Sequence, residues 1–344
     1  MRVIEGDLCH RLIRDKKQHK LKFDENKDYA TWRNQVKDKF FELIGIENIK
    51  ANACPLNMEI EEDVIKDGYR QIRFVFESEV GSFVPCYLLI PTNLGGKKVP
   101  VAITLQGHSS GFHNSIGVIK YPDKDTDYHP RGQFAIQAVK EGYAALAIEQ
   151  RGMGERRPRG PYQDGAQMCA YEAQMALLLS RTILAERMWD VSKAIDLLPN
   201  FPELDTDKIF ITGNSGGGTM SFYSACFDDR IKFTVPSCAF CTYASSILNT
   251  FHCSCNFIPR SYEYFEMEDI ACLLAPKRVV FIAGVEDVIF PIEGVREAYA
   301  TVEKIYKKAG AEGKCTLIET PKGHWWCEDI VWTQVKNVVN ELDW

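Results

Sequence analysis

Residues 208–226 read KIFITGNSGGGTMSFYSAC and contain the motif that decides the fold. The apolar run 208–212 predicts a strand, and the segment 219–226 predicts a helix. Between them, the Gly-x-Ser-x-Gly sequence of residues 213–217 predicts a nucleophile elbow, a turn so tight that only small residues fit beside the serine. We therefore expect the Ser215 hydroxyl to stand above the end of a sheet, with the following N–H groups directed at whatever it attacks.

The sequence around this motif alternates between strand and helix patterns. Near-continuous apolar strands separated by helices predict a mostly parallel, twisted sheet with helices on both faces. A turn at 79–82 makes the first two strands an antiparallel hairpin at the N-terminal edge of that sheet. The other expected strands are 99–105, 143–149, 231–236, 277–283 and 314–319, after the hairpin strands 69–77 and 83–90; the expected helices are 28–44, 132–140, 171–198, 293–309 and 330–342.

The α/β pattern predicts one large domain preceded by a short extension. With 344 residues the chain can bury a large core. We expect an N-terminal helical extension over residues 1–50 and the α/β domain over residues 51–344. The irregular stretches 151–170 and 237–269 have the length typical of lids or binding loops.

Composition and charge exclude several classes of partner. Hydrophobic residues make up 45% and charged residues 26%, and the net charge is −6 with Lys and Arg scattered along the chain, which argues against nucleic acid. No apolar stretch approaches the roughly 20 residues that cross a bilayer, so we expect no membrane association. The N-terminus carries charges where a signal peptide needs an apolar segment, which predicts a cytoplasmic protein.

The 12 cysteines are expected to be mostly free thiols in a reducing compartment. Cys238-x-x-Cys241 and Cys253-x-Cys255 lie close in sequence, and four thiolates could hold zinc or an iron–sulfur cluster. The second pair is spaced too tightly for the usual zinc knuckle, and cysteine is a common buried residue. The sequence therefore predicts no metal and no cofactor.

A serine nucleophile needs a base, and the base needs an orienting carboxylate. For a serine in this elbow the order along the chain is Ser, then Asp or Glu, then His. His324 follows the last expected strand and is the candidate base. Asp287 follows the strand 277–283 and is the candidate acid; its neighbour Glu286 is the rival, but the shorter side chain of Asp287 suits a fixed contact with a histidine.

Hydrolysis of an ester also needs donors for the tetrahedral oxyanion, each contributing about 3–4 kcal/mol. The backbone N–H of Gly216, directly after the nucleophile, is the first candidate. The loop after strand 99–105 reads Gln-Gly-His-Ser-Ser-Gly from residue 106, and the backbone N–H of His108 is the second.

These features resemble the α/β-hydrolase superfamily, most closely its dienelactone hydrolase and acetyl xylan esterase branch. Gln106-Gly107-His108 stands where that branch has a His-Gly-x oxyanion loop, residues 149–154 (EQRGMG) where it has Arg-Gly-Gln, and residues 213–217 where it has Gly-x-Ser-Gln-Gly. Gln106, Met153 and Gly216 depart from the pattern, which weakens the deacetylase assignment but leaves the triad intact. The resemblance implies a structural role for Arg151, and it leaves the N-terminal extension unexplained.

The leading interpretation is a serine carboxylic-ester hydrolase that acts on short-chain acyl esters, including acetylated carbohydrate, through Ser215, His324 and Asp287. Aromatic side chains near the expected site could stack on a sugar or aryl group: Phe112, Tyr162, Trp325 and Trp326. Two alternatives stay open, a serine peptidase of the prolyl oligopeptidase type and a non-catalytic hydrolase fold used for binding. The natural ester, its acyl length and the oligomeric state are left open.

Overall fold

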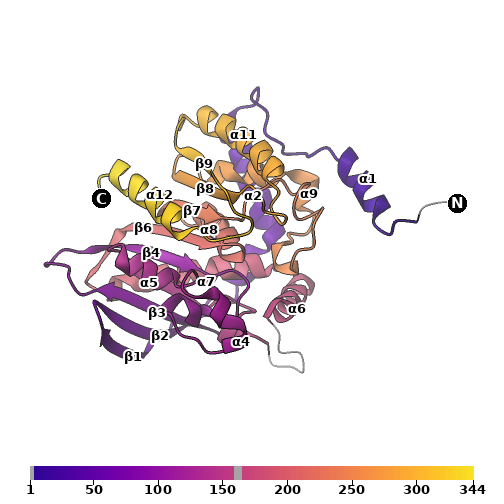
Figure 1. Cartoon of the computed structure of the whole chain (residues 1–344). Coiled ribbons are helices and arrows are strands. Elements are labelled where there is room, and N and C mark those ends of the chain that lie inside the picture. Colours follow the sequence, from indigo (N-terminus) through magenta and orange to yellow (C-terminus); the bar gives the residue numbers. More distant parts are fainter. Residues whose placement is uncertain (1–3, 159–164) are drawn as a thin grey trace.

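A nine-stranded sheet forms the centre of the molecule in the computed structural model, which describes residues 4–158 and 165–344 (Figure 1). Its strand order is β1-β2-β3-β5-β4-β6-β7-β8-β9. The strands are β1 (Glu59–Lys66), β2 (Tyr69–Glu79), β3 (Ser82–Pro91), β4 (Val99–Leu105), β5 (Ala144–Ile148), β6 (Leu204–Asn214), β7 (Ile231–Ser237), β8 (Arg278–Gly284) and β9 (Cys315–Thr320).

The pairing is mixed, as the sequence predicts. Strands β1 to β3 pair antiparallel in sequence order, β3 pairs antiparallel with β5, and every pairing from β5 to β9 is parallel. The expected mostly parallel sheet with an antiparallel N-terminal edge is therefore confirmed. The sequence analysis missed β1, whose residues are mostly exposed and so lack the apolar run that marks a buried strand.

Helices cover both faces of the sheet and enclose two cores. On one face, α2 (Tyr29–Ile44), α7 (Ile183–Leu197), α8 (Gly216–Phe227) and α11 (Ile292–Lys308) pack over alternate strand residues such as Ile103 and Ile211. On the other face, α5 (Phe134–Lys140) and α12 (Glu328–Glu341) pack over the intervening residues, among them Phe210 and Phe233 (Figure 1). Alternation along each strand thus divides its side chains between the two cores.

The N-terminal helices differ in how firmly they are held. The helix α2 buries Trp32, Val36, Phe40 and Ile44 in the larger core, and it ends at Gly45, whose φ of 72° is a left-handed cap. After it comes the short α3 (Ile46–Lys50), which is followed by β1. The helix α1 (Leu8–Lys16) buries no residue and lies away from the body of the molecule in Figure 1.

The prediction of one long helix over residues 171–198 is wrong in one respect. The structure has two helices there, α6 (Gly165–Leu178) and α7. Ser180 has a φ of 56°, which a continuous right-handed helix does not contain. The Thr182 side chain then accepts a hydrogen bond from the Ala185 N–H and caps α7. Apolar spacing runs through both helices, so the periodicity did not show the break.

Short helices occupy most of the remaining connections, including both irregular stretches. They are α4 (Pro122–Asp125), α9 (Ser261–Tyr264), α10 (Met267–Ile270), η1 (Phe112–Ile116), η2 (Thr126–Tyr128), η3 (Gly154–Arg156), η4 (Leu198–Asn200), η5 (Ser254–Asn256) and η6 (Ala271–Leu273). The helix η5 packs against α6, so segments of the two stretches lie side by side. None of the described helices has the length and hydropathy needed to cross a membrane.

Candidate active site

Ser215 stands at the junction of β6 and α8, with φ of 56° and ψ of −124°. This conformation costs about 1–3 kcal/mol for a residue with a side chain, and it persists only where the surroundings enforce it. They do so here: a Cβ on Gly213 would lie 2.3 Å from the Leu105 carbonyl oxygen, and one on Gly217 would lie 2.0 Å from the same oxygen. The flanking glycines let the elbow pass directly over the end of β4.

A histidine and a carboxylate meet on the loops that follow β9 and β8. His324 Nδ1 lies 2.8 Å from Asp287 Oδ2. The other oxygen, Oδ1, accepts hydrogen bonds from the N–H groups of Ile289 at 2.8 Å and Phe290 at 3.1 Å. The Asp287 side chain is 1% exposed, whereas its rival Glu286 is exposed to solvent. The carboxylate is thus held in one orientation against the ring.

Ser215 and His324 line the same cavity, whose volume is about 700 Å³. In the described part of the chain no hydrogen bond joins the Ser215 hydroxyl to the imidazole. Contacts of this kind are often long in an unliganded site and shorten when substrate is bound. The structure therefore brings all three predicted residues to one edge of the sheet, although Ser215 and His324 are not hydrogen-bonded to each other in the described part of the chain.

Two other histidines, His108 and His252, line this cavity, but their contacts differ from those of His324. His252 Nε2 lies 3.0 Å from the Ser246 hydroxyl, and burial lowers the pKa of His252. His108 Nε2 lies 3.4 Å from the Cys255 sulfur. Of the three rings, His324 is the one that contacts a carboxylate in the described part of the chain, which is the arrangement that a general base requires.

The predicted oxyanion donors lie beside the nucleophile. Gly216 is the first residue of α8, where N–H groups have no acceptor within the helix. The loop after β4 packs on the elbow so closely that a Cβ on Gly107 would lie 3.0 Å from the Ser215 Cβ. His108 follows on the cavity wall, and its backbone carbonyl accepts a hydrogen bond of 3.0 Å from the Tyr128 hydroxyl. Gly216 and His108 thus both border the cavity that contains the serine.

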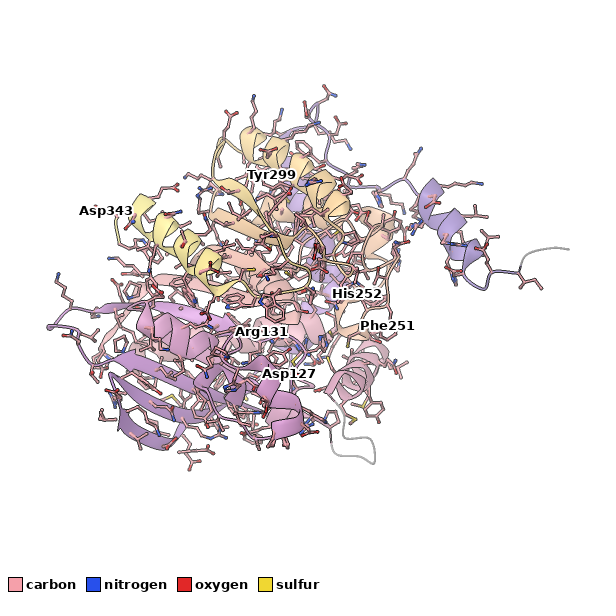
Figure 2. The ribbon with its side chains drawn as sticks, viewed as in Figure 1. Asp127, Arg131, Phe251, His252, Tyr299 and Asp343 are labelled. Atoms are coloured by element: carbon pink, nitrogen blue, oxygen red, sulfur yellow. The ribbon has the colours of Figure 1, made fainter. Side chains whose placement is uncertain are left out.

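Much of the cavity wall comes from residues that the sequence analysis missed. Tyr128 and Arg131 follow β4 on a long connection, and Phe251 and His252 belong to the stretch 237–269 (Figure 2). The Phe251 side chain is 95% exposed, although it is large and apolar. An exposed aromatic ring beside a cavity is a common feature of ligand sites. In the sequence, however, Phe251 is only an isolated apolar residue in a loop, so it could not be recognised.

The aromatic residues predicted to bind substrate are mostly placed elsewhere. Phe112 is buried against Tyr87 in the smaller core, and Trp326 is buried against Phe134 with its indole N–H donating to Gln137 Oε1 at 3.0 Å, so both predictions are corrected to core packing. Trp325 is 43% exposed and lies beneath the guanidinium of Arg131, 3.9 Å from the ring centroid. The fourth, Tyr162, lies outside the described residues.

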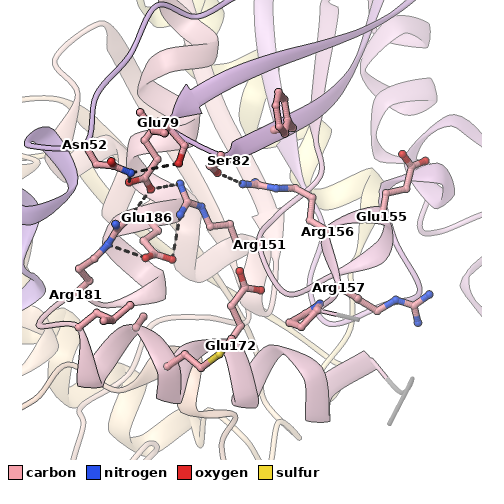
Figure 3. A pocket seen from close by; sticks show the side chains of 17 residues that line it. Asn52, Glu79, Ser82, Arg151, Glu155, Arg156, Arg157, Glu172, Arg181 and Glu186 are labelled. Atoms are coloured by element: carbon pink, nitrogen blue, oxygen red, sulfur yellow. Dashed lines mark hydrogen bonds and ion pairs between the residues drawn. The ribbon is translucent and has the colours of Figure 1, made fainter. Parts of the chain in front are cut away.

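Arg151 lines a separate cavity of about 580 Å³, whose lining does not include Ser215. Figure 3 shows this cavity. Its guanidinium pairs with Glu79 at 2.6 Å, Asp190 at 2.9 Å and Glu186 at 3.3 Å. Arg181 and Arg156 complete this buried network with ion pairs to Glu79 and Asp190, respectively. The ion pairs of Arg151 join β2, the 151–158 loop and α7, which fits the structural role expected of this residue.

The four cysteines grouped in the sequence analysis separate into two sets. Cys238 Sγ lies 3.5 Å from the Trp325 carbonyl oxygen, and Cys241 Sγ lies 3.7 Å from that of Pro291. Cys253 and Cys255 lie with His108 and Cys169 instead. The four-thiolate site considered from the spacing is therefore absent from the described residues.

Comparisons with known proteins agree with this architecture. A family model described as "Abhydrolase family" matches residues 5–308, which includes the N-terminal helices. A Bacillus subtilis (strain 168) protein named "Putative hydrolase YtaP" is 26% identical over 243 residues, covering 70% of this chain and 77% of that protein.

Solved esterase structures share the fold at low sequence identity. One, described as a "putative acetyl xylan esterase" from Bacteroides fragilis NCTC 9343, has a TM-score of 0.80 at 16% identity and covers 98% of this chain and 95% of its own. Acetyl xylan esterase 1 from Thermoanaerobacterium sp. JW/SL YS485 has a TM-score of 0.58 at 16% identity, covering 97% and 98% of the two chains. A glucuronoyl esterase from Solibacter usitatus has a TM-score of 0.62 at 15% identity, covering 91% and 93%.

Proposed function

Because this chain belongs to the Abhydrolase family and has the α/β-hydrolase fold, we propose that it is a serine carboxylic-ester hydrolase acting on short-chain acyl esters. The observation that carries the proposal is the contact between the buried Asp287 carboxylate and His324, which lines the cavity that contains Ser215. Two backbone N–H groups hold the Asp287 carboxylate facing the His324 ring. A carboxylate free in solvent would not fix the orientation of the ring in this way.

In the proposed reaction Ser215 attacks the acyl carbon while His324 Nε2 removes the hydroxyl proton. Asp287 keeps the proton of the neutral ring on Nδ1 and stabilises the imidazolium that forms. The backbone N–H groups of Gly216 and His108 would bind the oxyanion, which stabilises the tetrahedral intermediate more than the substrate. The imidazolium then protonates the leaving alcohol, and water releases the acyl group by the reverse sequence.

Acetylated carbohydrate is the substrate class that we propose to test first. Support comes from the names of the acetyl xylan esterases that share the fold, and from a cavity wall that combines aromatic rings with polar groups. Arg131, beneath which the Trp325 ring lies, and Phe251 are the side chains placed to contact a sugar or a longer acyl chain.

The proposal is tested with p-nitrophenyl esters of increasing acyl length and acetylated sugars. Ser215→Ala should lose at least about 1,000-fold in kcat while the protein remains folded. Ser245→Ala, which removes a half-buried hydroxyl outside the cavity, is the matched control and should retain full activity. Hydrolysis of peptides in place of esters would favour a peptidase, and a Ser215 that fluorophosphonate does not label would favour a binding role.

A further inference from the structure

Four side chains with metal-binding atoms converge beside the cavity. The ring nitrogen of His108 and the sulfurs of Cys169, Cys253 and Cys255 all lie within 4.8 Å of one another. They come from three distant segments: the loop after β4, the helix α6 and the 250–256 loop that contains η5. Cys169 and Cys255 are buried, while His108 and Cys253 line the cavity and give an ion a path of entry.

We propose that these four residues form a binding site for a thiophilic divalent cation, with zinc as the expected ion. Three sulfurs and one imidazole nitrogen are a donor set that structural zinc sites use. A tetrahedral ion with Zn–S bonds of about 2.3 Å separates its sulfurs by about 3.8 Å. Atoms already within 4.8 Å of one another reach this spacing through small rotations of side chains, without a change of fold.

The charge around the cluster suits an ion with three thiolates. Three thiolates and a divalent cation carry a net charge of −1, and this charge would be buried. The guanidinium of Arg187 is buried beside it, and its Nη2 donates to Cys169 Sγ at 2.9 Å. An N–H donor to a ligand sulfur is the usual outer support of such a site.

Little apolar packing holds the segments around the cluster together, so a bound ion could have a structural role there. Among the residues that the structure describes, the apolar core at this point consists of Met153, Cys169, Ala173, Ile183 and Cys255, and it is small compared with the two cores of the sheet. Loops with so little apolar burial gain much of their order from a cross-link or a metal. An ion here would fasten α6 and the 250–256 loop, which form part of the cavity wall, to the loop that contains His108.

The orientation of His108 adds a consequence that rests on the proposed function. Nε2 faces Cys255, while Nδ1 lies on the side of Gly216, 3.4 Å from where a Cβ on that residue would be. Metal binding through Nε2 would leave the ring proton on Nδ1. The ion would therefore fix the tautomer and the position of the residue whose backbone N–H is a candidate oxyanion donor.

The experiment is a metal analysis of the full chain, purified in the presence of a reductant. Expected are about one equivalent of zinc, its removal by a chelator, and stoichiometric uptake of Co²⁺ with the intense charge-transfer band of cobalt–thiolate bonds. Cys169→Ser and Cys255→Ser should each weaken Co²⁺ binding at least about 100-fold, and Arg187→Gln about 10- to 100-fold. Cys54→Ser changes a half-buried cysteine outside the cluster and should bind as the unaltered protein does.

The unaltered protein by itself keeps the proposal open to refutation, even if a variant fails to fold. A folded, reduced chain that binds neither Zn²⁺ nor Co²⁺ would overturn it. So would a disulfide, mapped by peptide mass spectrometry, between two of the three cluster sulfurs in the reduced preparation with no ion bound. Cobalt binding that survives the Cys169→Ser/Cys255→Ser double change would also overturn it. Metal content and ester hydrolysis are separate readouts, so a failure of the hydrolase assignment leaves this result intact.

Discussion

Replacing Asp287 by Asn gives the most specific test of the proposed chemistry, because the side chain keeps its shape. The amide oxygen can still accept from the N–H groups of Ile289 and Phe290, which are 2.8 and 3.1 Å from Oδ1. The amide NH₂ then faces His324 Nδ1 across the 2.8 Å contact. Nδ1 must now accept a hydrogen bond, so the ring proton moves to Nε2 and the ring can no longer take the proton of Ser215.

The expected loss follows from this reversal of the tautomer. In hydrolases with this arrangement the change lowers kcat by about 10⁴, which corresponds to about 5.5 kcal/mol of transition-state stabilisation. Stability should change little because both backbone hydrogen bonds of the buried side chain survive. The assay measures kcat for p-nitrophenyl acetate together with the thermal unfolding midpoint.

Glu286→Gln is the matched control, since it makes the same chemical change on the adjacent, exposed carboxylate. It should leave kcat within about twofold. The reasoning is refuted if Asp287→Asn stays within tenfold of the unaltered enzyme, or if the two variants lose activity equally.

Three further predictions concern the elbow, a buried acid and the cavity mouth. Gly217→Ala would place a Cβ 2.0 Å from the Leu105 carbonyl oxygen. It should lower the free energy of unfolding, measured by urea titration, by at least about 3 kcal/mol. The control Gly6→Ala, with no neighbour within 4 Å, should leave that free energy unchanged. Burial raises the pKa of Glu149 to about 7, so the folded state holds a proton that the unfolded state releases, and its contribution to stability is present below about pH 4.5 and lost as the pH rises through 7. Urea titrations should show this decline, and Glu149→Gln should flatten it; an unchanged slope would contradict the assignment. Phe251→Ala removes a 95% exposed ring at the cavity, and it should raise KM severalfold for long-acyl esters with stability unchanged to within about 0.5 kcal/mol; equal KM values would show that the ring does not contact substrate.

The parts of this molecule that were predictable from sequence are those with a local cause. The elbow could be recognised because its strand, its Gly-x-Ser-x-Gly turn and its helix are contiguous in residues 208–226. The order of parallel strands then predicted that Asp287 and His324 would follow β8 and β9, at the same edge of the sheet. Buried strands were likewise visible as apolar runs.

The parts that were missed depend on contacts between distant segments. Phe112 follows the oxyanion loop in sequence, but its ring turns away from the cavity and packs against Tyr87. Cys253 and Cys255 attracted attention through their spacing, yet their neighbours in space are His108 and Cys169, about which the spacing says nothing. The exposed strand β1 has no continuous apolar run, and the apolar spacing continues across the break at Ser180.

The position of β1 has a consequence for how copies of this chain meet. It is the outermost strand of the sheet, so one side of its backbone has no strand partner among residues 4–158 and 165–344 and could pair with a strand from another molecule (Figure 1). Four of its first five residues are acidic: Glu59, Glu61, Glu62 and Asp63. Although arginines of β2 reach Glu61 and Asp63, the border stays rich in carboxylates. Two such borders laid together would repel each other at neutral pH, which disfavours edge-to-edge pairing of two sheets.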